Sequence, residues 1–321
     1  MQRTMAISVR GSEGAAIMSE VPRVTGRLDI SELIDSFLAA QDVREISRTL
    51  YRKGLGRFWS WFETIGIVQP DRETILRFKT FLQECGLAAN TINSYLVAVK
   101  RFFTYLEGMR LYPDVAKNIK GVQQPKNNLR ESPTIAQVKE ILTQIDTGTV
   151  RGKRDFAIVN VMARSGLRTI EIIRANLEDL RQEAGEALLY IQGKGRDSKD
   201  EFILLTEAAL KPILEYLKER KNPQPDAPLF VSMSDRNNGE RLTTATLRKI
   251  VRELFRAIGI DKPRRICAHS LRHFFATQAL RAGAPLIQVR DALRHSSIET
   301  TQKYLHTIDR LDKAAERYIN F

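Results

Sequence analysis

A stretch without hydrophobic periodicity, GVQQPKNNLRESP at residues 121–133, divides the chain into two parts. Its Pro, Asn, Gln and charged residues are typical of an exposed linker. A chain of 321 residues is long enough for two domains that each bury a core of their own. We therefore expect two domains that are joined, and hinged, at this linker.

The part before the linker has helical periodicity. Apolar residues recur at helical spacing over 92–106, where Asn90 is a candidate N-cap. A second such pattern, 47–65, is expected to bury Leu50 together with Phe58, Trp61 and Phe62. Residues 29–120 thus predict a compact four-helix domain with a basic side. That side carries Arg52, Lys53, Arg57, Asn93, Lys100 and Arg101.

Residues 1–28 are rich in Gly, Ser and Arg and lack a clear period, so we expect a flexible tail there. After the linker, in 134–321, most of the sequence again favours helices. One exception is a predicted hairpin, in which Ala187 to Gln192 and Glu201 to Leu205 are short strands on either side of the turn GKGRDSK. The expected fold class is mainly α with a small antiparallel β-sheet.

The net charge of +13, with a pI near 9.8, indicates a polyanionic partner. Fourteen Lys or Arg residues stand against five Asp or Glu between Arg241 and Arg310, which is a net +9. Nucleic acid is the partner that such a surplus favours. The alternative is a solvated basic surface without a partner.

Other features restrict where the protein acts. Cys85 and Cys267 are far apart and in no metal-ligand spacing, which fits a reducing compartment. No apolar run approaches the roughly 20 residues of a membrane helix, and no secretory signal is visible. We expect a cytoplasmic, nucleoid-associated protein without a membrane partner.

All four histidines lie within 38 residues of the most basic region: His269, His273, His295 and His306. His269 and His273 have a zinc-binding spacing, but the residues between them are Ser-Leu-Arg, with no Glu to act as base and a cation that repels metal. We expect no metal site. A helix over 269–282, ended by Gly283, would place His269 and Arg272 on one side, where both can donate to a single phosphate. The alternative is a surface arginine and a histidine at a helix N-terminus.

The next segment places His295 at the end of one predicted helix. Ser296 and Glu299 can form a capping box that starts another helix, which carries Tyr304. A tyrosine beside Leu305 can also be a core residue, so the residue type alone does not assign a role.

At this point five motifs, in order, resemble the tyrosine recombinases, the group of phage integrases and bacterial Xer proteins. They are ANTINSYLVAVKRFFTYL, SGLRTIEI, YIQGKGRDSK, HSLRHFFATQAL and LRHSSIETTQKYLH. The resemblance covers roughly residues 29–306. It implies a two-domain enzyme, with a helical core-binding domain that contacts DNA through the basic side described above and a mixed α/β catalytic domain.

Residue by residue, the resemblance implies that Arg168 and Arg272 clamp the scissile phosphate and that His269 and His295 complete the pocket. Glu171 would orient Arg168. Lys194 would protonate the departing 5′-oxygen, and Tyr304 would attack phosphorus to form a 3′-phosphotyrosyl intermediate. No cofactor is expected, since the covalent bond retains the energy of the broken linkage and the chain has no P-loop or dinucleotide turn.

The sequence departs from the family at Arg294, where the family usually has glycine. This puts the turn before His295 in question and offers a possible further phosphate contact. An amphipathic pattern over 307–321 predicts a C-terminal helix, which either docks on its own domain or, as the resemblance implies, on a neighbouring protomer of a DNA-bound homotetramer.

Two other functions remain open. A type IB topoisomerase would use the same chemistry without exchanging partners, and a non-catalytic DNA-binding regulator would not use it at all. The short tail favours a simple Xer-like or mobile-element recombinase over one with an arm-site domain. The DNA site and the biological role are not specified by these residues.

Overall fold

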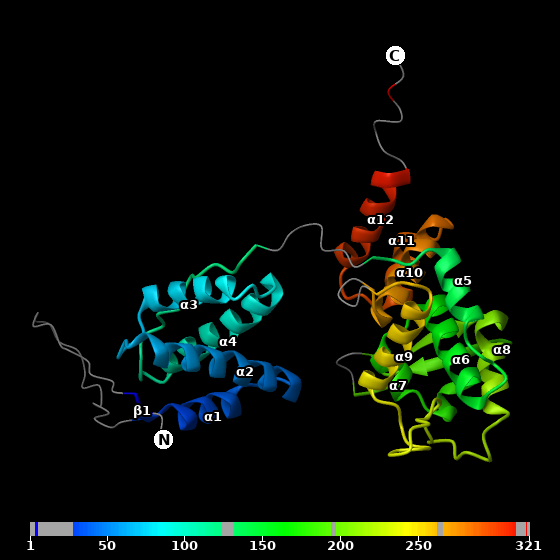
Figure 1. The fold of residues 1–321 in the computed structure, drawn as a ribbon, viewed down its shortest axis with the longest axis horizontal. Helices are drawn as coiled ribbons and strands as arrows, with labels where there is room; N and C mark the ends of the chain where they lie inside the picture. Colours follow the sequence, from blue (N-terminus) through cyan, green and yellow to red (C-terminus); the bar gives the residue numbers. More distant parts are fainter. Residues whose placement is uncertain are drawn as a thin grey trace, which may run out of the picture. The chain divides into compact units, whose positions relative to one another are not determined.

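The computed structural model describes residues 4–5, 28–123, 131–193, 197–261, 266–312 and 319. Two compact units follow one another along the chain, Met1–Asn128 and Leu129–Phe321, and Figure 1 shows the helices of each. Most of the tail expected over 1–28 and most of the expected linker lie outside the described residues.

The described part of the first unit contains four α-helices. They are α1 (Ile30–Ala40), α2 (Glu45–Phe62), α3 (Arg72–Glu84) and α4 (Ala89–Gly108), with a 3₁₀ turn, η1 (Glu63–Ile65), after α2 and a two-residue pairing of β1 (Thr4–Met5) with β2 (Leu28–Asp29). Their core is rich in aromatic rings, among which Phe58 and Phe78 meet edge to face at 5.0 Å. α2 packs closely against α4, because Gly54 leaves room for Ala98 and Tyr95: a Cβ at Gly54 would lie 2.9 Å from that of Ala98.

Two local predictions for this unit are wrong. Leu50 is 49% exposed, because the buried stripe of α2 begins one turn later, at Gly54. Asn90 is the second residue of α4 and does not cap it, since the helix begins at Ala89 and Ala88 occupies the N-cap position without a side-chain bond.

The second unit contains the predicted hairpin, and the structure confirms it. Strands β4 (Glu186–Ile191) and β5 (Glu201–Leu205) pair antiparallel, with Leu189 opposite Ile203. A third strand that the sequence did not predict, β3 (Leu180–Glu183), extends the sheet in the order β3-β4-β5. The tip of the hairpin, residues 194–196, lies outside the described residues.

Helices form most of the rest of this unit (Figure 1). They are α5 (Ile135–Thr143), α6 (Val150–Ser165), α7 (Thr169–Arg174), α8 (Glu207–Leu217), α9 (Thr244–Ala257), α10 (Ala268–Arg281), α11 (Leu286–Leu293) and α12 (Ile298–Asp312), with a 3₁₀ turn, η2 (Leu177–Asp179), before β3. α6 is the central helix, because its residues 157–163 are all buried and it packs against both α8 and α10. The fold is therefore mainly helical with a small antiparallel sheet, as predicted.

The C-terminal part differs from the expectation in its boundaries. α12 begins at Ile298, so that Ser297, rather than Ser296, precedes the helix, and the Ser297 hydroxyl donates to the Glu299 carboxylate. The same helix continues to Asp312, so the first residues of the predicted C-terminal helix extend the helix of Tyr304. Residues 313–318 and 320–321 lie outside the described part. Among the residues that the structure describes, no helix is long and apolar enough to cross a bilayer.

Candidate active site

The turn between α6 and α7 fixes the first arginine. Gly166 ends α6 with a φ of +64°, and a Cβ there would lie 2.6 Å from Phe275 Cδ1 and 2.8 Å from Leu293 Cδ2. Only glycine fits this position without displacing either neighbour. Arg168 follows at the N-cap of α7, with its side chain 22% exposed.

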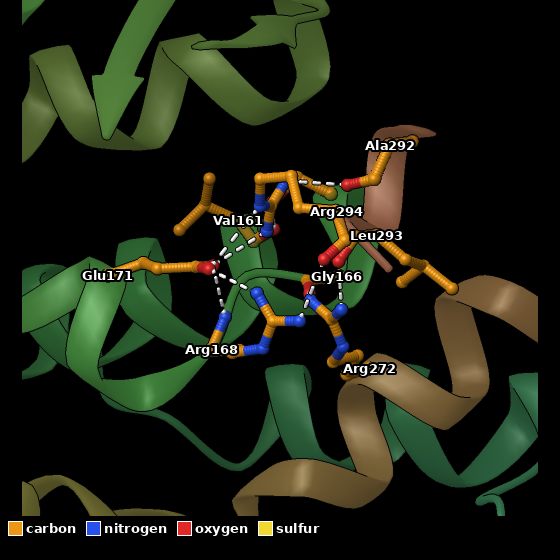
Figure 2. A network of polar contacts seen from close by, with 9 residues as sticks. Val161, Gly166, Arg168, Glu171, Arg272, Ala292, Leu293 and Arg294 are labelled. Carbon is orange, nitrogen blue, oxygen red and sulfur yellow. Dashed lines mark hydrogen bonds and ion pairs between the residues drawn. The ribbon is translucent and has the colours of Figure 1, made fainter. Parts of the chain in front are cut away.

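Glu171 lies at the centre of the polar network in Figure 2 and is fully buried. Its carboxylate accepts from the main-chain N–H of Arg168 and from Nη1 of the same residue, both at 2.7 Å. On its other side, Nη2 of Arg294 donates at 2.6 Å. Burial alone would raise the pKa of this carboxyl, but Arg294 and Arg168 together hold it below its ordinary value. Glu171 is therefore ionised and holds Arg168 in place.

Arg294, where the family usually has glycine, forms the turn before His295 and points its side chain into the protein. It ends α11 in the left-handed region, at φ 54° and ψ 48°, which glycine adopts without strain and arginine rarely does. Its side chain is only 5% exposed and turns inward to Glu171. Its carbonyl oxygen accepts from Nη2 of Arg168 at 3.1 Å, a bond between residues 126 positions apart.

Arg272, on α10, is 1% exposed. Its Nη1 donates to the carbonyl oxygen of Gly166 at 2.7 Å and its Nη2 to that of Leu293. Within the described residues its Nε has no partner. Burial, and repulsion from Arg168 and Arg294, lower the pKa of Arg272 to about 9. A buried cation with an unused donor and an excess of like charge around it is suited to bind an anion.

Tyr304 lies among aromatic rings next to these arginines. It is 8% exposed, and its ring centroid is 5.2 Å from that of His273 and 6.5 Å from that of His295. His269 continues the series at 4.8 Å from His273, and it is exposed. Burial raises the pKa of the Tyr304 phenol, against the opposing charges of Arg272 and Arg168, so the phenol is protonated at neutral pH.

His295 follows the Arg294 turn. Its Nδ1 lies 2.9 Å from the hydroxyl of Thr301, a fully buried residue of α12. Burial and the three arginines lower the pKa of His295 to about 4, so the ring is neutral at physiological pH. A neutral imidazole can either donate or accept a hydrogen bond at the nitrogen that Thr301 does not use.

A cavity of 660 Å³ opens beside Arg168, Arg294 and His295 and reaches Gly193 at the base of the hairpin. Its lining also includes three acidic residues, Asp200, Glu201 and Asp291. Lys194, the next residue, lies outside the described part of the chain. Lys199, at the other end of the turn, donates to Asp179 at 2.5 Å. Asp179 is 2% exposed, so Lys199 anchors the hairpin to the turn before β3.

The basic residues predicted for the first unit make several contacts within it. Arg52 pairs with Asp35 at 2.7 Å, and Arg57 lies over the ring of Phe81 at 5.1 Å. Arg101 similarly lies over the ring of Tyr51 at 5.7 Å, and Lys53 is exposed.

Asn93 and Lys100 hold the segment after α4 in place. Asn93 exchanges two hydrogen bonds with the main chain of Val122, at 2.7 and 2.9 Å, and Lys100 donates to the carbonyl oxygen of Ile119.

The structure thus brings Arg168, Glu171, Arg272, His295 and Tyr304 together, and it places His269 next to them through His273. Sequence reasoning missed two members of the cluster. His273 was considered only as a metal ligand, although its spacing from His269 already put both on one helix face. Thr301 carried no signal, since a threonine in a helix is ordinary.

Similarity to known proteins identifies the family of the chain. The model of the Phage integrase family matches residues 134–310. The chain is 30% identical to the tyrosine recombinase XerD of Listeria innocua serovar 6a, over 86% of this chain and 94% of that protein. It is 31% identical to the tyrosine recombinase XerA of Pyrococcus furiosus, over 89% and 94% respectively.

The chain belongs to the phage integrase family. It is a site-specific tyrosine recombinase, an enzyme that cleaves and rejoins DNA. Among solved structures, the XerH recombinase bound to a palindromic difH substrate, in a post-cleavage complex, is similar with a TM-score of 0.71 and 25% identity, over 90% of this chain and 84% of that one. A family member of this kind carries out phosphoryl transfer on DNA.

Proposed function

We propose that Tyr304 is the nucleophile of this recombinase and that Arg168 and Arg272 bind the scissile phosphate. The observation that carries the proposal is the position of the buried Tyr304 phenol beside Arg272, whose guanidinium has an unused donor and an excess of positive charge around it. An anion would offset that charge. In a recombinase of this family, that anion would be a phosphate of the DNA substrate.

The proposed reaction has two balanced steps. The Tyr304 oxygen attacks phosphorus, and the bond to the 5′-oxygen breaks to leave a 3′-phosphotyrosyl link and a 5′-hydroxyl. A 5′-hydroxyl of the partner strand then attacks the same phosphorus and releases the tyrosine. Negative charge builds on the non-bridging oxygens in both steps, where two fixed guanidinium groups stabilise it more than in the ground state.

Protons move at the two bridging oxygens. The phenol must pass its proton to a neighbouring base or to water as it attacks, and the charges of Arg272 and Arg168 favour this loss. The departing 5′-oxygen must gain one, a role that we assign to Lys194. Neutral His295, which lines the cavity, would donate a hydrogen bond to the phosphate, and His269 would complete the pocket from the exposed side.

We further propose that the substrate is a double-stranded recombination site. In its solved structure, the similar recombinase XerH is bound to a difH substrate. The residues of 29–120 that would contact the DNA backbone are Arg52, Lys53, Arg57, Asn93, Lys100 and Arg101. Because Asn93 and Lys100 already bind main-chain atoms after α4, their DNA contacts would be secondary to those of the exposed Lys53 and Arg57. Such a DNA enzyme would act in the cytoplasm, at the nucleoid.

The first test is Tyr304→Phe, which removes only the nucleophilic oxygen. The variant is expected to bind a half-site with the affinity of wild type and to form no covalent complex on a denaturing gel. An adduct of normal yield would remove Tyr304 from its assigned role.

Strand exchange would take place in a homotetramer that is assembled through residues 307–321. Because α12 continues to Asp312, the informative truncation ends the chain there and keeps the helix of Tyr304 intact. Deleting 313–321 should leave half-site binding unchanged while weakening the pairing of two sites and changing the cleavage yield. Exchange at the full-length rate would place the assembly contacts elsewhere.

A further inference from the structure

The buried guanidinium of Arg294 is a feature that the proposed chemistry does not use. It reaches Glu171 from the turn between α11 and α12, on the side of the carboxylate away from the Arg168 guanidinium, and Figure 2 shows the carboxylate between the two arginines. A residue held in the left-handed region, where arginine is strained, is expected to gain something from its side chain.

A direct contact with the phosphate is one candidate role, since Arg294 lines the cavity. Its donors point against this role. Nε donates to Glu171 at 3.3 Å, Nη2 to the same carboxylate at 2.6 Å, and Nη1 to the carbonyl oxygen of Ala292 at 2.5 Å. Each of the three nitrogens is thus engaged within the protein, and the side chain is 5% exposed.

The charges of the cluster point to a different role. Glu171 holds Arg168 in position, but its negative charge also cancels the charge of that arginine at the phosphate. The buried cluster contains three arginines, Arg168, Arg272 and Arg294, and one carboxylate. With Arg294 in place, the carboxylate is neutralised from both sides and the remaining charge equals that of two free guanidinium groups.

We propose that Arg294 is a positioning residue that neutralises Glu171, so that Glu171 orients Arg168 without cancelling its charge at the scissile phosphate. This inference rests on the proposed role of Arg168. The main chain of Arg294 adds a second contribution, because its carbonyl oxygen accepts from Nη2 of Arg168 and so fixes the plane of the guanidinium. Arg294 therefore forms the turn that precedes His295 and shares with Glu171 the orientation of Arg168.

Substitution by glycine separates these two contributions. Arg294→Gly retains the carbonyl oxygen, and glycine adopts the left-handed turn without strain. Arg294→Lys keeps the backbone strain, so the melting temperature of the Gly variant should fall no more than that of the Lys variant. The rate of covalent adduct formation at saturating DNA should fall about tenfold in Arg294→Gly, and less in Arg294→Lys, since the charge is kept. The dissociation constant for a half-site should stay at the wild-type value in both.

A double-mutant cycle with Glu171→Gln decides between neutralisation and direct contact. Glutamine keeps one of the two acceptor oxygens and removes the charge, so Arg294→Gly should cost little or nothing in the Gln background while it costs about tenfold in the Glu background. An equal loss in both backgrounds would overturn the proposal in favour of a phosphate contact or a purely structural role. So would an Arg294→Gly variant that cleaves at the wild-type rate. A failure of the Arg168 assignment itself would show separately, as normal cleavage by Arg168→Ala.

Discussion

The imidazole ring of His295 lies parallel to the phenol ring of Tyr304, with the centroids 6.5 Å apart and an angle of 3° between the planes. His295 follows α11 and Tyr304 lies on α12, so the short turn between these helices sets the position of both rings. The buried Thr301, one turn before Tyr304 on α12, binds Nδ1 of His295 at 2.9 Å and fixes that position. Tyr304, the proposed nucleophile, and His295 are thus held as one unit.

Arg168 and Arg272, which we propose bind the scissile phosphate, should respond differently to truncation. Arg168→Ala is expected to slow adduct formation by about 10²–10³-fold, in line with the ~2.7–4 kcal/mol lost when one oxyanion donor is removed. It should affect thermal stability little, because the buried Glu171 keeps Arg294 as a partner. Arg272→Ala should slow the reaction as much and also lower the melting temperature, since it leaves the carbonyl oxygens of Gly166 and Leu293 without their donor. Single-turnover cleavage and thermal melts measure both effects, and near-normal cleavage by Arg168→Ala would defeat the clamp.

Lys194 can be tested by the leaving group. Lys194→Ala should cleave normal DNA slowly and a 5′-bridging phosphorothiolate substrate at close to the wild-type rate, because sulfur departs without a proton. Lys199→Ala is the matched control from the same turn. It should lower thermal stability, since Lys199 pairs with the buried Asp179, and the sulfur substrate should not rescue its rate. Rescue of the Lys199 variant alone would exchange the two assignments.

His295 predicts a specific pH dependence of stability. Its pKa is about 4 in the folded protein and 6.5 as the ordinary value, so between these pH values the unfolded chain binds a proton that the folded chain does not. The free energy of unfolding of wild type should therefore fall as the pH is lowered from 6.5 towards 4. His295→Gln lacks this contribution, and its fall should be smaller in urea titrations over the same range. Parallel curves for the two proteins would mean that burial does not hold His295 neutral.

Gly166 should tolerate substitution less well than a glycine of similar conformation in open space. Gly166→Ala combines a positive φ with contacts of 2.6 and 2.8 Å to Phe275 and Leu293, whereas Gly185, at φ +84°, has no atom within 4 Å of its added Cβ. Gly185→Ala should cost about 1 kcal/mol of stability from backbone strain, and Gly166→Ala roughly 1–3 kcal/mol more from overpacking. Denaturant titrations measure the free energy of unfolding of both variants. Equal losses would show that Phe275 and Leu293 can move to accept the added methyl group without a loss of stability.

Much of this arrangement could be predicted from the sequence because it depends on local patterns. Helical spacing predicted α2, α4 and α10, and alternation beside a Gly-rich turn predicted β4 and β5. The third strand, β3, was missed because its four residues, LRQE, have no buried side chain that would reveal a period. The predicted N-cap at Asn90 was wrong because α4 begins at Ala89, with Ala88 at the N-cap position and no side-chain capping bond to reveal the start.

The interior of the site could not be predicted in the same way. The Arg168 to Arg294 bond joins residues 126 positions apart, and no periodicity connects them. The inward turn of Arg294 depends on the buried Glu171, whose environment only the fold defines. The sequence shows that Arg294 departs from the family motif, but it does not show that the Arg294 side chain points towards Glu171 rather than towards solvent.

The central claim is that Tyr304 forms the covalent bond to DNA, and peptide mapping of the trapped adduct tests it most directly. Trypsin places the two C-terminal tyrosines in different peptides, because Lys303 and Arg310 bound YLHTIDR and Arg317 precedes YINF. After nuclease digestion, mass spectrometry should find the added nucleotide mass on the peptide of residues 304–310, or on a longer peptide that contains it if trypsin does not cleave after Lys303. A nucleotide on residues 318–321, at Tyr318, would contradict the account.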